Sequence, residues 1–311
     1  MVHVLYRISN NSYNKVRLDN ATKKNCLINA INAFNPENKD LVKFYLFGDG
    51  INEETGKEID EIIGKNPLVT YIPIKGGSGA ASFNIVLDCA LTLPEEDIIY
   101  FVEDDYAWRK EGLELIIDVM NYGVDYYTSY THPDKHIPPP KGNPEVDLDG
   151  GYLTKVYNIT GNLYYMVNST TMTFCSKVKT LKEDESILRK WTNMGDYPQD
   201  FQMFLELRDK GKILLCSLVP YSCHLEKAWL APTPNIKNID LTNTFISIIK
   251  LYKKIALLGN IGSNILDIAR NINISFSKIG IYETFSELLK VKNDSLREEI
   301  VEFFYLQNHK I

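Results

Sequence analysis

Three consecutive carboxylates, Glu103, Asp104 and Asp105, directly follow the uninterrupted apolar run Ile98–Val102. Acidic side chains repel one another and are costly to remove from water unless a positive charge lies beside them. The apolar run is typical of a strand buried on both faces of a parallel sheet, and ligands of such sheets bind beyond the carboxyl ends of the strands. Hard oxygen ligands at this place suit Mg²⁺ or Mn²⁺, so we predict a metal site rather than a solvated acidic turn. Side chains alternate along an extended chain, so we expect Glu103 and Asp105 on one side and Asp104 on the other.

Two acids and one histidine further along the chain are candidates for the same chemistry. Asp200 lies in the first turn of a predicted helix over 198–210, where a carboxylate either acts as a general base or simply interacts with the helix dipole. Asp196 competes with it for the role of base, or caps the helix. His224 follows a predicted strand over 213–219. A lone histidine is more often structural, but a neutral imidazole at a strand end is also a common metal ligand.

Three polar residues in the first half are candidates for contacts with a nucleotide. Arg7 lies in the first predicted strand, and an arginine there can pair with phosphate. Asp49 ends the second strand between two glycines, where it either accepts a hydrogen bond from a base or ribose, or shapes the turn. Asn84 is a polar residue in a small, apolar helix, where it either bonds a nucleotide or caps a neighbouring loop. The glycines at 76–79 have neither the Lys-Ser/Thr of a P-loop nor the G-x-G-x-x-G spacing.

Strand and helix patterns alternate through the first half of the chain. Strands are predicted at 2–8, 43–47, 68–74 and 98–102, and helices at 26–34, 53–63 and 79–91. This alternation predicts an open α/β sheet. The second half is less regular, with predicted strands at 126–130, 163–174 and 213–219 and a Pro/Gly-rich loop at 132–151. Beyond Pro232, apolar residues at helical spacing predict an all-α extension.

Composition narrows the classes of protein that fit this chain of 311 residues. Forty acidic residues against 34 basic ones give a formal charge of −6, which argues against nucleic-acid binding by a broad basic face. Five cysteines, an odd number without a C-x-x-C pair, argue against a zinc knuckle and a disulfide framework. No apolar run approaches the ~18 residues of a membrane span, and no signal-peptide pattern opens the sequence. We therefore expect a cytoplasmic protein with reduced thiols.

Short motifs along residues 1–230 resemble, in their order and spacing, those of the GT-A glycosyltransferases, especially the family 2-like inverting enzymes. The segments that carry this resemblance are Ser9–Lys15, Phe47-Gly48-Asp49, Gly79–Asn84, Phe101–Asp105, which is similar to the DxD region, and Gln199-Asp200, which is similar to an acceptor-side Glu-Asp pair. Two positions depart from the family pattern. Glutamine stands at 199, and Glu103 stands where a strict DxD has aspartate.

The resemblance implies a fold and a reaction. The fold is a GT-A-type open mixed sheet flanked by helices, with a catalytic domain over 1–232, divided near 106 into a donor half and an acceptor half, and a helical extension over 233–311. The implied reaction is metal-dependent transfer of a sugar, with inversion, from a nucleotide-diphosphate sugar to a hydroxyl of a glycan or glycoconjugate. Tyrosines near Tyr127–Tyr130 and the loop at 132–151 are expected to shape the acceptor side.

The resemblance also implies roles for single residues. Asp200 would be the general base. The donor nucleotide would contact Arg7, Ser9, Asp49, Asn84 and Asp104, and a Mn²⁺ or Mg²⁺ ion would be held by Asp105 with His224 and Glu103. Two alternatives stay open: a nucleotidyltransferase, although its glycine- and basic-rich phosphate loop is not seen near the first strand, and a non-catalytic interaction module. The segment 235–311 would pack on the catalytic domain, form a homo-oligomer contact or touch a membrane surface.

Overall fold

The computed structural model describes residues 1–11, 16–35, 37–130, 132, 140, 143–145, 151–153, 156–160, 162–217, 220–226 and 275–277. Its helices are α1 (Lys23–Phe34), α2 (Glu53–Lys65), α3 (Gly79–Leu91), α4 (Gly112–Asn121), α5 (Val178–Thr192) and α6 (Asp200–Asp209). The strands of its main sheet are β1 (Val2–Ser9), β2 (Val42–Asp49), β3 (Val69–Ile74), β4 (Ile98–Glu103), β6 (Tyr126–Thr128), β8 (Val156–Ile159), β9 (Asn162–Met166), β10 (Phe174–Lys177) and β11 (Leu214–Ser217).

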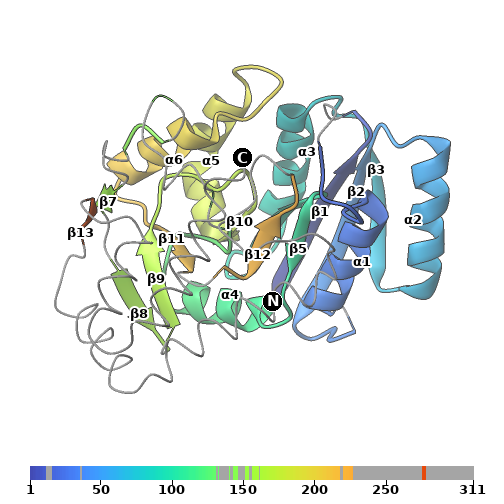
Figure 1. The fold of residues 1–311 in the computed structure, drawn as a ribbon, viewed down its shortest axis with the longest axis horizontal. Helices are drawn as coiled ribbons and strands as arrows, with labels where there is room; N and C mark the ends of the chain where they lie inside the picture. Colours follow the sequence, from blue (N-terminus) through green and yellow to red (C-terminus); the bar gives the residue numbers. More distant parts are fainter. Residues whose placement is uncertain are drawn as a thin grey trace, which may run out of the picture.

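These nine strands form one mixed sheet in the described part of the chain, in the order β3-β2-β1-β4-β10-β6-β11-β9-β8 (Figure 1). Strands β3, β2, β1 and β4 run parallel, and β10 joins β4 antiparallel. The predicted open mixed sheet flanked by helices is confirmed. Because Arg7 pairs with Glu103 and Ser9 with Asp49, the carboxyl ends of β1, β2 and β4 meet at one edge.

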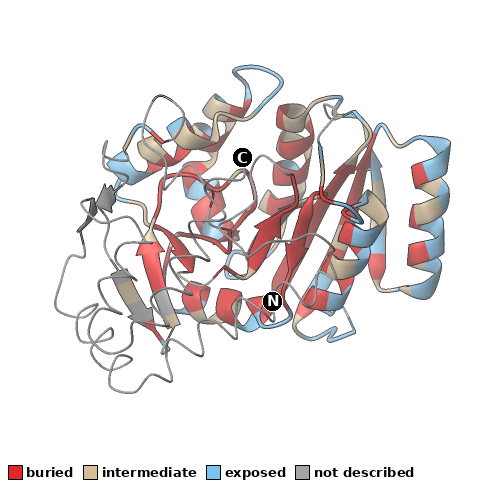
Figure 2. Cartoon of the chain, viewed as in Figure 1, coloured by how far each residue is buried: buried red, intermediate tan, exposed pale blue. Residues whose placement is uncertain are grey.

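Helices cover both faces of the sheet over two hydrophobic clusters. Residues of α1, α2 and α4 pack on one face, and residues of α3, α5 and α6 pack on the other. The central strands β1, β4, β10, β6 and β11 are buried, whereas the edge strand β3 and the outer faces of the helices are partly exposed (Figure 2). Side chains of β1 alternate between the clusters, with Val4 and Tyr6 in the first and Leu5 in the second. By the same alternation Arg7 lies on the α3 side, with its guanidinium carbon 5.4 Å from the ring centre of Phe83.

Two short sheets lie outside the main one. Strand β5 (Tyr106–Trp108) pairs antiparallel with β12 (Ser222–His224), and β7 (Gly151–Leu153) pairs antiparallel with β13 (Ser275–Ser277). The β5–β12 pairing places His224 opposite Tyr106, next to the acidic turn after β4. It therefore brings together two segments that are more than a hundred residues apart.

The structure differs at one point from the all-α extension predicted for residues 233–311. Of residues 233–311 the structure describes only 275–277, and these form β13, a strand. Apolar residues at every second position, Ile272, Ile274 and Phe276, favour an extended chain at this point. The rest of this segment, most of the loop at 132–151 and residues 12–15 lie outside the described residues. Within the described part of the chain, no helix has the length and apolar character needed to cross a membrane.

Candidate functional site

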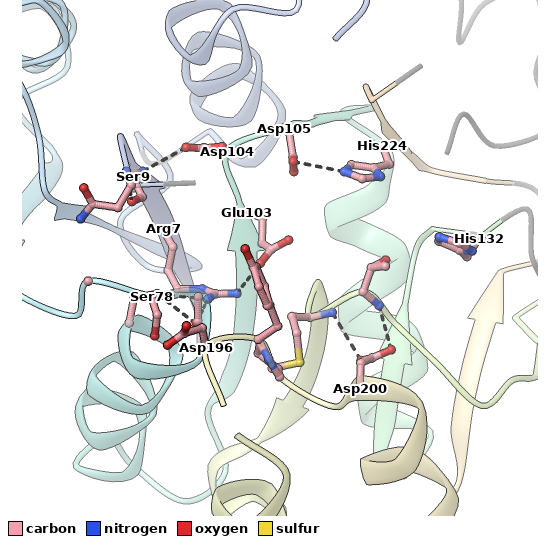
Figure 3. A pocket seen from close by; sticks show the side chains of 18 residues that line it. Arg7, Ser9, Ser78, Glu103, Asp104, Asp105, His132, Asp196, Asp200 and His224 are labelled. Carbon is pink, nitrogen blue, oxygen red and sulfur yellow. Dashed lines mark hydrogen bonds and ion pairs between the residues drawn. The ribbon is translucent and has the colours of Figure 1, made fainter. Parts of the chain in front are cut away.

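A pocket of about 510 Å³ opens at the carboxyl ends of β1 and β4, where the sequence predicts a ligand site. One side, here called the strand wall, consists of Arg7, Ser9, Glu103, Asp104, Asp105 and His224. The opposite side, here called the loop wall, consists of Thr171, Met172, Asp196, Tyr197, Pro198 and Asp200. The start of α3 and two further side chains complete the lining: Asn11, Gly77, Ser78, Gly79, Ser82 and His132. Figure 3 shows these side chains converging on one space.

Asp105 and His224 form the most buried pair of ionisable side chains in the strand wall. Asp105 Oδ2 lies 3.1 Å from His224 Nε2, and the two side chains are 1% and 7% exposed. The backbone N–H of Leu225 donates to the carbonyl of Asp105 at 2.8 Å, which fixes the end of β12 against the acidic turn. The sequence predicted that these two residues would meet, and the structure brings them together.

The chemistry of this pair fits a divalent ion. Adjacent ligands of an octahedral ion with bonds of ~2.1 Å lie ~3.0 Å apart, close to the observed separation of Asp105 Oδ2 and His224 Nε2. Neither ring nitrogen of His224 has a hydrogen bond to the described residues, although both are buried. Two protein ligands leave the other positions of such an ion for water and phosphate oxygens.

Glu103 does not join this pair. Its Oε1 lies 2.9 Å from Arg7 Nη2, and Arg7 also donates through Nη1 to the carbonyl of Gly79 at 3.1 Å. Among the described residues no group of three or more His, Cys, Asp or Glu side chains could hold a metal ion. All three acids line the pocket, because residues 104 and 105 form a turn and the alternation of an extended chain stops at Glu103.

Asp104 is held by positive groups from the preceding loop and helix. Its carboxylate accepts the backbone N–H of Ser9 at 3.0 Å, a hydrogen bond from Arg17 Nη2 at 2.9 Å, and a hydrogen bond from Lys23. Burial alone would lower the pKa of Arg17, but the charges of Asp104 and Asp105 outweigh it and raise that pKa. The predicted contact of Asp104 with a ribose stays a prediction.

Two residues predicted to bind the nucleotide lie outside the pocket lining. Asp49 accepts the backbone N–H groups of Gly76 and Gly77, both at 2.9 Å, and so shapes the turn before α3. Asn84 donates to Asn193 Oδ1 at 3.0 Å and accepts from Thr192 Oγ1 at 2.8 Å, which ties α3 to the end of α5. Each makes contacts of the structural kind that its sequence context left open, and its predicted contact with a nucleotide stays a prediction. Arg7 and Ser9 do line the pocket.

The two acids of the loop wall differ in their partners. Asp200, the first residue of α6, accepts hydrogen bonds from the turn Thr170–Met172. Asp196 is exposed and has no hydrogen bond or ion pair from its side chain to the described residues. The N-cap of α6 is Gln199, without a side-chain cap, so Asp196 does not cap this helix.

Several residues in or beside the pocket were not found from the sequence. Thr171 accepts a hydrogen bond from the hydroxyl of Tyr106 at 2.8 Å, and the ring of Tyr106 stacks on His224 with centroids 4.8 Å apart. Burial raises the pKa of Tyr106 well above its ordinary value, and the negative charge of Asp105 raises it further, so this hydroxyl stays protonated. Tyr106 thus connects the strand wall to the loop wall. Arg17 and Lys23 did carry a signal, the run of basic residues between the first strand and helix.

No model of a known protein family matches the sequence, and no curated protein matches it significantly. Solved structures do match. One is GalNAc-T7 with UDP, GalNAc and Mn²⁺, at 12% identity and a TM-score of 0.47, over 99% of this chain and 57% of that one. Another is the mannosyltransferase PcManGT from Pyrobaculum calidifontis in complex with GDP-Man and Mn²⁺, at 12% identity and a TM-score of 0.40, over 99% of this chain and 81% of that one.

A third match is the inositol-1-phosphate CTP transferase from T. maritima, at 13% identity and a TM-score of 0.40, over 80% of this chain and 96% of that one. The matched structures include GT-A fold glycosyltransferases, the group that the sequence motifs resemble. This chain spans just over half of the GalNAc-T7 chain, 57%. Because each of these TM-scores is below 0.5, the fold class rests on the strand order and the function on the geometry of the pocket.

Proposed function

We propose that this protein transfers a sugar from a nucleotide-diphosphate sugar to a hydroxyl acceptor, with a divalent metal, Mn²⁺ or Mg²⁺, bound at Asp105 and His224. The observation that carries the proposal is this buried carboxylate–imidazole pair, 3.1 Å apart, in a pocket whose opposite wall holds Asp196, a carboxylate with no hydrogen bond or ion pair to the described residues. One wall suits a metal and a diphosphate, and the other suits the removal of a proton from the acceptor. The pocket volume also lies in the range of small-molecule sites.

The strand wall would bind and orient the donor. Arg7 is 7% exposed and held by Glu103 and the carbonyl of Gly79, so its guanidinium has a fixed place beside the start of α3. Arginine recognises phosphate through planar, charge-assisted hydrogen bonds, and a helix N-terminus adds backbone N–H groups to an anion site. A bound divalent ion would supply the positive charge that stabilises a departing diphosphate.

Asp104 would act in the same wall. With Arg17, Lys23 and the N–H of Ser9 on its carboxylate, it keeps two cations beside the acidic turn without leaving their charge unpaired. A ribose hydroxyl reaching this carboxylate would join these donors. Inversion at the anomeric carbon is what the family resemblance implies, and two opposed walls would let the acceptor attack from the face opposite the leaving group.

Titration calorimetry with UDP, GDP and dTDP, each with and without Mn²⁺, tests the proposal. We expect one nucleoside diphosphate to bind only when Mn²⁺ is present, and the Asp105→Asn variant to lose this binding. Asp88→Asn, which removes a carboxylate on the outer face of α3, is the matched control and should bind as the native protein does.

A screen of UDP-, GDP- and dTDP-sugars for nucleotide release then identifies the donor. Release of pyrophosphate from a nucleoside triphosphate instead would favour the nucleotidyltransferase. Absence of binding by every one of the three diphosphates with the metal present would refute the transferase and favour the non-catalytic module.

A further inference from the structure

We propose that Asp196 takes the proton from the acceptor, and that Asp200 is a positioning residue that holds the turn Thr170–Met172 in the loop wall. The inference rests on the proposed function, because it assigns the base of that reaction. It departs from what the resemblance implies, in which Asp200 is the base. The evidence for this assignment is the different set of contacts that each of the two carboxylates makes.

Asp200 has its hydrogen-bonding capacity filled. Oδ2 accepts the backbone N–H groups of Thr170 at 2.7 Å and Thr171 at 3.0 Å. Oδ1 accepts the Thr170 hydroxyl at 2.6 Å and the N–H of Met172 at 3.4 Å. An ionised carboxylate offers about four lone-pair sites, so these four donors occupy them. A general base must accept a hydrogen bond from the hydroxyl it deprotonates, and Asp200 would have to release a donor to do so.

The turn that Asp200 holds has an unusual backbone. Thr171 and Met172 have φ values of 50° and 57°, in the left-handed region that costs a residue with a side chain ~1–2 kcal/mol. The backbone N–H groups of Thr170, Thr171 and Met172 all donate to the Asp200 carboxylate, so this turn forms a concave anion site. The carboxylate of Asp200 fills that site and so offsets the strain. The turn places both side chains in the pocket lining and lets the Thr171 hydroxyl receive the Tyr106 hydrogen bond.

Asp196 combines a fixed backbone with an open carboxylate. Its carbonyl accepts the N–H of Ala80 at 3.0 Å, which anchors the loop to the first turn of α3. The next two residues, Tyr197 and Pro198, also line the pocket. The Asp196 side chain itself is exposed and has no hydrogen bond or ion pair to any described residue. Figure 3 shows it beside Ser78 and Arg7, whereas Asp200 points to its donors.

With Asp196 as the base, every bond and the proton of the sugar transfer are accounted for. The acceptor oxygen attacks the anomeric carbon and a new C–O bond forms. The bond between that carbon and the diphosphate oxygen breaks, and its electron pair leaves with the nucleoside diphosphate. The proton of the acceptor hydroxyl goes to the Asp196 carboxylate. A nucleophile that carries no proton, such as azide, completes the same displacement without a base.

Water must lose a proton when it attacks and azide has none to lose, so a comparison of the two nucleophiles tests the role of Asp196. Each variant is supplied with the UDP-, GDP- and dTDP-sugars, and the rates of transfer to water and to added azide are measured as nucleotide release and glycosyl azide. Asp196→Asn should lower transfer to water ~10²–10⁴-fold, the usual contribution of a general base, while transfer to azide persists. Asp200→Asn should lower both transfers together, so that the water-to-azide ratio stays near that of the native protein.

A second variant separates positioning from catalysis. Thr170→Val removes the hydroxyl that donates to Asp200 and leaves the carboxylate in place. If Asp200 acts through the turn, Thr170→Val and Asp200→Asn should give similar losses, and the double variant should lose less than the product of the two. Calorimetric binding of the nucleoside diphosphate checks that each variant is folded.

Two results would overturn the assignment of Asp196 as base, and a third would refute the proposed function. A fall in the water-to-azide ratio confined to Asp200→Asn would overturn the assignment and restore Asp200 as base. An unchanged ratio in Asp196→Asn would also overturn it. Absence of transfer by the native protein to either nucleophile would instead refute the proposed function on which the assignment depends.

Discussion

The two walls of the pocket treat their acids in different ways. In the strand wall each acid meets a basic side chain from a distant part of the chain: Glu103 meets Arg7, Asp104 meets Arg17 and Lys23, and Asp105 meets His224. In the loop wall Asp200 meets backbone and hydroxyl groups, and Asp196 has no partner among the described residues.

This difference distinguishes carboxylates that shape the pocket from carboxylates that can bind a ligand or a proton. A carboxylate that is held by several fixed donors, such as Asp104 or Asp200, contributes to the form of the pocket and is costly to disturb. A carboxylate that lies against another metal-binding side chain, such as Asp105, can take a ligand without breaking its surroundings. A carboxylate with no hydrogen bond or ion pair to the described residues, such as Asp196, can likewise take a proton. The comparison therefore ranks the acids by what their removal should do.

The largest effect is expected for Asp105→Asn. It keeps the size of the side chain but removes the charge that, with His224, would hold the metal. Loss of several kcal/mol of charge stabilisation predicts a fall of ~10³-fold in Mn²⁺-dependent transfer. Calorimetric titration with Mn²⁺ alone should show the same loss independently of activity.

Glu103→Gln is the matched control for this prediction. Glu103 lies two residues away in the same wall, but its partner is Arg7 and its side chain is 29% exposed. We expect Mn²⁺ binding to persist in this variant. Equal loss of Mn²⁺ binding in both variants would show that the two acids share the ion and would remove the distinction drawn within the strand wall.

The parallel half of the fold could be predicted from the sequence, and the reason is local. Strands such as Ile98–Val102 are buried on both faces and have continuous apolar sequences. Ser78 caps α3 by accepting the N–H of Ala81, as its position before Gly79 indicates.

Helices α4 and α5 were not predicted. Helix α5 is rich in charged residues, and its few buried apolar positions are set by packing against α3 and α6.

The site could be predicted in part. Asp105 follows β4, and His224 lies beyond β11 as the last residue of β12, so the rule that ligands bind at strand ends indicates both. The contacts of Asp49 and Asn84 depended instead on the direction of a side chain, which the sequence does not encode locally. Thr171 and Met172 carried no signal, because their left-handed backbone is imposed by Asp200 from thirty residues away. Such tertiary effects override the preference of the residue itself.

The second largest effect is expected on the free energy of unfolding. Asp104→Asn removes the charge shared by Arg17 and Lys23, whose side chains are 15% and 20% exposed, so both cations become partly buried without a counter-charge. Breaking a buried pair costs ~3–5 kcal/mol, and the partial exposure reduces this to ~2 kcal/mol. Urea unfolding should show a lower midpoint with an unchanged slope.

Glu96→Gln provides the comparison for Asp104. Glu96 also lies between two cations, Lys177 and Lys179, at 3.0 and 2.9 Å, but it is 67% exposed. Water and salt screen this pair, so the variant should unfold at nearly the native midpoint. Equal destabilisation by the two changes would show that burial of the strand wall does not strengthen its ion pairs.

The smallest effect compares one glycine from each side of the pocket. Gly77 has φ +78°, and its N–H donates to Asp49, whereas Gly195, next to Asp196, lies outside the positive-φ region. An added Cβ meets no atom within 4 Å at either position, so any difference between the two comes from the backbone alone. Gly77→Ala should cost ~1 kcal/mol, and Gly195→Ala should be neutral or slightly stabilising because it restricts the unfolded chain. Thermal unfolding of the pair checks this, and equal costs would mean that the loop beside Asp196 is as strained as the turn before α3.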